Sequence, residues 1–188
     1  MVSASERGLT AQIAIVGGGL SGLYAAALLG KHGLTDYLLL EASPSFGGRI
    51  DSVPPAPASL GERGDAQESR GRFDLGATWF WPRLQPQLGR IFGPEAAAPK
   101  VEFVKDWART PFTATAADLH AVAGHSHAPS PVAASGDWRD RITGIASEWS
   151  PEFPGYVAGA IDAASRGVAR LAPHVRAEAS RRQAEESH

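Results

Sequence analysis

Residues 13–29 read IAIVGGGLSGLYAAALL, and this stretch determines the expected fold. It begins in an apolar run over residues 11–16, which is typical of a buried parallel strand. Glycines end that strand. From Leu20 to His32 apolar residues then recur at helical spacing, and Gly33 is a helix C-terminal signal. Residues 37–40 read YLLL, a second buried strand, so the sequence predicts a right-handed βαβ unit.

The glycines after the first strand have G-x-G-x-x-G spacing, in the strand-to-helix context of a dinucleotide-binding turn. Gly17 permits a tight turn, Gly19 lets the backbone approach a diphosphate, and Gly22 lets the helix pack closely on the strand. Amides at the helix start, such as that of Ser21, would donate to the diphosphate. Glu41 ends the second strand, where its carboxylate would accept ribose hydroxyls and disfavour a 2′-phosphate. A merely flexible turn does not account for the whole pattern.

The composition and net charge of the chain exclude several classes of binding partner and metal site. The chain has 188 residues, a net charge of −2 and a pI near 6.3, which gives no basic footprint for nucleic acid or anionic lipid. Without cysteine there is no disulfide, thiolate metal site or cysteine nucleophile. His120, His125 and His127 lie in an Ala/Ser/Pro-rich loop without a suitably spaced carboxylate, so no metal is expected. We expect a cytoplasmic protein that binds neither nucleic acid nor membrane.

Residues 41–50, EASPSFGGRI, resemble the E-A-x-x-x-x-G-G-R motif of the flavin-containing amine oxidase family, which includes monoamine, polyamine and putrescine oxidases. The resemblance implies that Arg49 approaches the FAD phosphates and that Gly47 and Gly48 let the chain pass close to the cofactor. Residues 73–82, FDLGATWFWP, resemble the family's D-x-G-A-x-W loop beside the flavin ring. That match implies cofactor contacts at Gly76 and Ala77.

Residues 146–171, ASEWSPEFPGYVAGAIDAASRGVARL, resemble the last flavin-binding segment of the same family. The resemblance implies that Tyr156 forms one wall of an aromatic cage and orients the amine, and that Ser147 and Val157 touch the cofactor. A helix over 156–171 would aim its N-terminus at the flavin. Alanines 116 and 117 stand where the family's tethering cysteine and second cage tyrosine would be, so FAD is expected to be bound noncovalently.

The two matching stretches, about residues 12–87 and 89–171, lie at opposite ends of a much longer protein in the family. We therefore expect an internal deletion, with a junction near residues 83–92 and a truncated or absent substrate domain. The expected parts follow in chain order. They are a flexible leader (1–10), the N-terminal FAD-binding βαβ and GGR region (11–92), a C-terminal segment completing the FAD domain (93–172) and a charged tail that extends the last helix or frays (173–188).

The expected fold is α/β, a Rossmann-type FAD/NAD(P)-binding domain. By resemblance the expected function is that of an FAD-dependent oxidoreductase of amine oxidase type, which takes a hydride from a small-molecule amine and passes electrons to oxygen. The alternative is a non-catalytic FAD-binding or partner-binding remnant, because the missing region would hold the walls of the substrate site. A third reading is a chain that does not fold stably alone, because its sheet edges are exposed. A homo-oligomer would cover such surface.

Overall fold

The structure is a computed structural model, which describes residues 8–53, 73–76, 84–98, 105–115, 128 and 130–186. The chain divides into two compact units. The first unit combines Met1–Gly48 with Val122–His188, and the second unit is Arg49–Ala121.

The predicted βαβ unit is present at the start of the first unit. Strand β1 (Ile13–Val16) pairs in parallel with strand β2 (Tyr37–Leu40), and helix α1 (Leu20–Lys31) connects them. The amide of Leu34 donates to Leu29 O and that of Gly33 to Gly30 O, which closes the helix in a Schellman-type end. Gly33 has φ 73°, a backbone conformation that glycine adopts without strain. The glycine signal for the end of the helix is thus confirmed.

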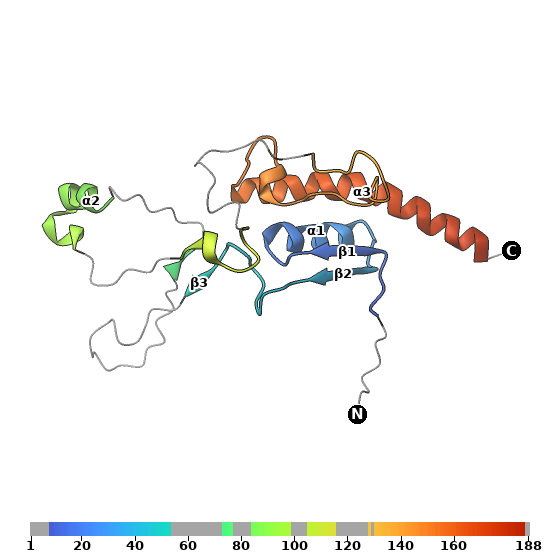
Figure 1. Ribbon diagram of the computed structural model, residues 1–188, viewed down its shortest axis with the longest axis horizontal. Helices are drawn as coiled ribbons and strands as arrows, with labels where there is room; N and C mark the ends of the chain where they lie inside the picture. The colour runs from blue at the N-terminus through green and yellow to red at the C-terminus, as the bar shows by residue number, and fades with distance from the viewer. Residues whose placement is uncertain are drawn as a thin grey trace, which may run out of the picture. The chain divides into compact units, whose positions relative to one another are not determined.

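Helix α3 (Val157–Glu186) lies alongside α1 although more than a hundred residues separate them (Figure 1). The predicted helix ended at residue 171, whereas the observed one continues through Pro173, so the charged tail extends it. Apolar residues at helical spacing explain the extension, because Leu171 and Val175 still pack on the core. Beyond them Arg176 Nη2 donates to His32 O at 2.9 Å, which places a cation at the C-terminal end of α1.

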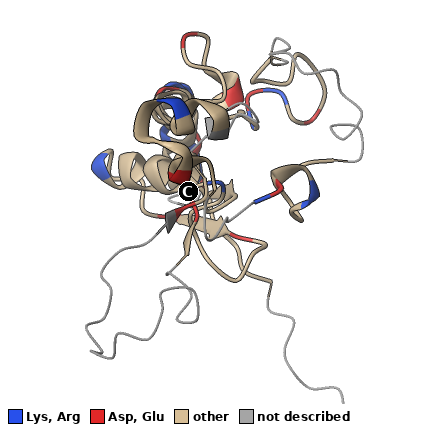
Figure 2. Ribbon diagram, turned by 90° about the vertical axis from the view of Figure 1, so that its left-hand side faces the viewer, with Lys and Arg blue, Asp and Glu red and all other residues tan. Residues whose placement is uncertain are grey.

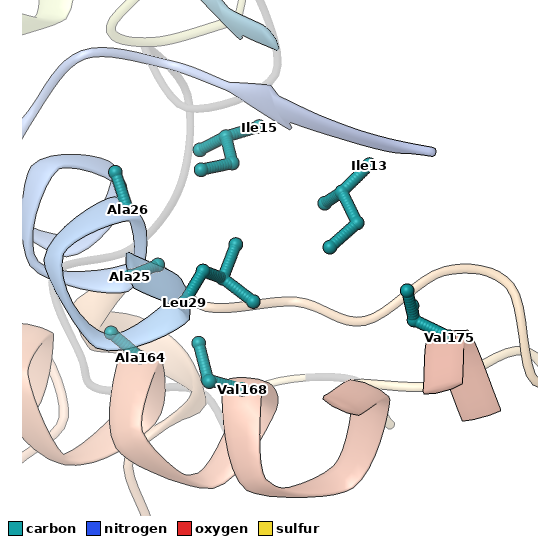
Figure 3. Packing of buried hydrophobic residues seen from close by; sticks show 8 residues of the cluster. All are labelled: Ile13, Ile15, Ala25, Ala26, Leu29, Ala164, Val168 and Val175. Atoms are coloured by element: carbon teal, nitrogen blue, oxygen red, sulfur yellow. The ribbon is translucent and has the colours of Figure 1, made fainter. Parts of the chain in front are cut away.

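The core of the first unit lies between β1, α1 and α3. Figure 3 shows Ile13 and Ile15 of β1 directed towards α1, with the side chains of α3 on the opposite side of that helix. Leu29 is 1% exposed at the centre of this cluster. Small residues let the two helices approach closely. The buried residues of the cluster are Ile13, Ile15, Ala25, Ala26, Leu29, Ala164, Val168 and Val175.

The prediction that both strands are buried is wrong for the part of the chain that the structure describes. Residues of β1 alternate between buried and exposed, and Val16 is 81% exposed. Its pairing partner Leu40 is 48% exposed. Alternation of this kind means that α1 covers one face of the two-stranded sheet and that the other is open among the described residues.

The second unit is built from short elements. Strand β3 (Ser52–Val53) pairs antiparallel with β4 (Phe73–Asp74), and helix α2 (Leu84–Phe92) packs against the 3₁₀ turn η2 (Pro94–Ala97). A second 3₁₀ turn, η3, spans Trp107–Arg109. Helix α2 was not predicted from the sequence. The sequence does predict a short strand over residues 101–104 and a surface excursion over residues 52–72. Residues 101–104 and 54–72 lie outside the described residues.

Charged residues of both signs are interspersed along the described ribbon (Figure 2). Ion pairs in this pattern include Asp106–Arg109 and Asp162–Arg166, which link residues three and four positions apart, and Asp51–Lys105, which links residues distant in the sequence. Within the described ranges, the helices are either too short or too polar to cross a bilayer.

Candidate functional site

The glycine turn between β1 and α1 has the geometry that its spacing predicts. Gly17 has φ 100°, and its amide donates to Leu40 O at 2.8 Å, which ties the turn to the end of β2. A Cβ built on Gly22 would overlap the carbonyl oxygen of Gly17 and lie 3.3 Å from Ile15 Cγ2. Only glycine at this position lets α1 begin so close to β1.

The Gly47–Gly48 pair packs directly on that turn. The Gly47 amide donates to Gly18 O at 2.9 Å, and Gly47 forms a parallel bridge with Gly19. A Cβ on Gly48 would lie 3.2 Å from Gly19 Cα, and both Gly47 (φ 123°) and Gly48 (φ 61°) adopt positive φ. Two glycine motifs that α1 and β2 separate in the sequence thus form one backbone surface.

The backbone of this surface is open at two of its glycines. A Cβ on Gly19 would meet nothing closer than 3.9 Å, and one on Gly17 nothing within 4 Å. Gly19 is the N-cap of α1 and offers no side-chain cap, so the first-turn amides, including that of Ser21, have no intrahelical partner. A helix start of this kind, next to an open backbone turn, fits the diphosphate of a dinucleotide.

Glu41 follows β2, at the same end of the sheet as the glycine turn. Its Oε2 accepts from the Gly18 amide at 2.6 Å and its Oε1 from the Ser43 amide at 2.7 Å. The hydrogen bond from Ser43, followed by that from Gly18, holds the pKa of this carboxyl below its ordinary value. Glu41 is therefore an ionised acceptor, oriented by two backbone amides and half-exposed, as a ribose-binding carboxylate requires.

Replacing Glu41 by Gln is expected to weaken ADP binding about tenfold, because an amide offers one acceptor oxygen and no charge.

The lowered pKa of Glu41 also predicts how the stability of the fold depends on pH. Stabilisation by the carboxylate is full above its ordinary pKa of 4.5 and is lost as the pH falls through the lower folded value. The melting temperatures of wild type and Glu41→Gln should therefore differ most near neutral pH and converge in acid. A constant difference across pH would contradict this role of the charge.

Two of the site residues implied by resemblance meet in the second unit. A Cβ on Gly76 would overlap the carbonyl oxygen of Arg49 and lie 2.9 Å from the amide nitrogen of Asp51. Leu75 N donates to Asp51 O at 2.7 Å, so the D-x-G-A loop lies against the backbone of the GGR run. The Asp74 carboxylate caps this loop by accepting from the Gly76 amide at 2.8 Å. Ala77 lies outside the described residues.

The C-terminal candidates surround the start of α3. Tyr156 directly precedes this helix and is 62% exposed, and Val157 is its first residue and is 48% exposed. Ser147 is 4% exposed, and its Oγ lies 3.1 Å from Glu148 Oε2. Its carbonyl oxygen accepts from the Ser150 and Gly155 amides, so Ser147 organises the loop that leads into the helix.

The loop that leads into α3 is stabilised by a hydrogen bond between two residues that the sequence analysis did not single out. Ser150 is 3% exposed, and its Oγ donates to Asp162 Oδ2 at 2.8 Å and accepts from the Phe153 amide. The hydrogen bond from Ser150, and then the one from Arg166, lowers the pKa of Asp162. Serine and aspartate twelve residues apart carry no recognisable sequence signal, because the contact depends on the turn between them.

No group of three or more metal-ligating side chains occurs among the residues with described positions. The histidines at 120, 125 and 127 fall outside them.

Residues 15–93 match a family model described as the NAD(P)-binding Rossmann-like domain. The match contains the end of β1, the glycine turn, Glu41 and the GGR run. It supports an α/β fold of Rossmann type with a dinucleotide cofactor site. It also indicates a dinucleotide-binding oxidoreductase.

Proposed function

We propose that this Rossmann-type chain binds FAD noncovalently and is an oxidoreductase of amine oxidase type. The observation that carries the proposal is the packing of Gly47 and Gly48 on the glycine turn, with the Gly47 amide on Gly18 O. A glycine turn followed by a carboxylate fits any ADP-containing cofactor. The added GGR run, which resembles that of flavin amine oxidases, favours FAD.

The second unit supports the same choice of cofactor. Gly76 lies on the Arg49 backbone, so the two stretches that resemble flavin-contacting motifs are joined by a contact that excludes any side chain at position 76. The Arg49 guanidinium would neutralise phosphate charge, as the resemblance implies. FAD, when bound, supplies the acceptor for a hydride.

Tyr156 is the residue that we propose to orient the amine substrate. It directly precedes α3, at the positive end of that helix dipole. The side chain is 62% exposed and therefore accessible to a ligand. Ser147, in the loop before α3, and Val157, the first residue of α3, would flank the cofactor, with Ser147 positioning the backbone rather than presenting its hydroxyl to solvent.

A non-catalytic FAD-binding chain is the second candidate, and a specific observation favours it. Among the described residues, Tyr156 and the open face of the β1–β2 sheet are solvent-exposed, with Val16 at 81%. Catalysis of hydride transfer benefits from a site that excludes water and fixes the substrate. The exposed tyrosine lacks that enclosure in the described part of the chain, whereas the dinucleotide turn is complete.

The two functions are separated by an absorbance spectrum of the purified full chain from 300 to 550 nm, followed by anaerobic addition of a panel of amines. Flavin bands that an amine bleaches would support the oxidase. Bands that persist with every amine would support the binding protein, and absence of flavin binding, even with added FAD, would contradict both. Tyr156→Phe is the matched variant: it should retain the bands and slow the bleaching, because only the hydroxyl is removed.

A further inference from the structure

Phe46, which neither the glycine pattern nor the resemblance assigns to the cofactor, lies on the dinucleotide turn. A Cβ built on Gly18 would overlap Phe46 Cδ1 and lie 2.8 Å from Cε1, so the ring rests on the Gly18 backbone. The same Cβ would lie 3.0 Å from Glu41 Oε2. The phenyl ring and the ribose-binding carboxylate therefore border one point of the turn.

The ring is nevertheless 62% exposed, while Gly18 beneath it is buried. One edge of Phe46 thus contacts the turn, and most of its surface faces solvent next to a charged acceptor. Aromatic faces are the surfaces on which bases and sugars stack, and covering such a face contributes to affinity without hydrogen bonds.

We propose that Phe46 is a cofactor-contacting residue, whose exposed face packs against the adenosine half of the bound dinucleotide. This inference rests on the proposed function, since it deepens the same site. It assigns the aromatic contact to the adenosine half because Glu41, which borders the ring, is the acceptor for the adenosine ribose. The Phe46 ring also occupies the space that a side chain at position 18 would need. It therefore holds the turn in the conformation in which the Gly18 amide donates to Glu41.

The test is titration of the ligand-free full chain with FAD, ADP and FMN, in wild type and in Phe46→Ala. The variant should bind FAD and ADP about tenfold more weakly, because it loses one stacking contact. FMN lacks adenosine, so its affinity should be unchanged. Phe46→Leu, which keeps bulk on Gly18 but loses the aromatic face, should fall between wild type and alanine, and Phe46→Tyr should match wild type.

Leu9→Ala is the matched control, since Leu9 is a large apolar residue of the same unit, is 80% exposed, and precedes β1 at the end opposite the turn. It should bind all three ligands like wild type. Equal binding of FAD by wild type and Phe46→Ala would overturn the inference, as would tighter binding or an equal loss for FMN. If wild type itself binds no ligand, the proposed function fails instead, which keeps the two failures distinct.

Discussion

A Gly22→Ala variant is expected to lose dinucleotide binding and to be destabilised by about 3 kcal/mol or more. The added Cβ would overlap the Gly17 carbonyl oxygen, which is backbone and cannot rotate away as a side chain can. Relief requires α1 to move from β1, which would open the core at Ile15 and shift the first-turn amides of α1 that we propose to bind the diphosphate. Thermal melting and an FAD titration measure the two effects.

Gly30→Ala is the matched control in the same helix. A Cβ on Gly30 would meet nothing within 4 Å, and the residue lies in the last turn of α1. Alanine should therefore stabilise the helix by about 0.5–1 kcal/mol, and FAD binding should stay unchanged. If both variants behave alike, helix propensity rather than the close approach of Gly22 to Gly17 would explain the data.

Gly159→Ala is expected to produce a comparably large loss, at the C-terminal part of the site. Its Cβ would overlap the carbonyl oxygen of Phe153 and lie 3.0 Å from that of Ser147. Both carbonyl groups belong to the loop that carries the cofactor candidates, so the first turn of α3 would separate from it. We expect destabilisation of about 3 kcal/mol, measured by denaturant unfolding, together with weaker flavin binding.

Gly167→Ala provides a graded comparison within α3. Here the added Cβ would meet the Ile145 Cγ2 methyl, a side-chain atom that another rotamer can withdraw. The loss should be smaller, about 1–2 kcal/mol. A loss at Gly167 equal to or larger than that at Gly159 would show that the helix packing, and not the loop carbonyls, sets the position of α3.

The βαβ unit could be predicted because each of its elements carries a local signal. Glycine spacing places the turn, apolar periodicity places α1, and Gly33 marks where the helix ends, all within a few residues of the observed bounds. Glu41 was identifiable for the same reason, since a carboxylate after the second strand has a fixed place in such a unit. Local chemistry alone determines these features.

Features that depend on distant contacts could not be predicted in this way. The uncovered face of β1 and β2 reads as apolar in sequence, so Val16 was expected to be buried, and its exposure depends on what packs there. The Ser150–Asp162 contact and the continuation of α3 past Pro173 depend on tertiary packing that no short motif encodes. Phe46 was visible only as a residue before two glycines, until its contact with Gly18 gave it a role.

The packing of α1 against α3 has a consequence for how the protein is made. Ala25, Ala26 and Leu29 leave the ribosome early, but their partners Ala164 and Val168 follow only after more than a hundred further residues. At ordinary rates of chain elongation, the interval between the synthesis of α1 and that of α3 is on the order of ten seconds. During it the nascent chain presents an apolar helix face and a two-stranded sheet without their cover. We expect chaperone capture of the nascent chain to be concentrated in that interval and to end when α3 docks.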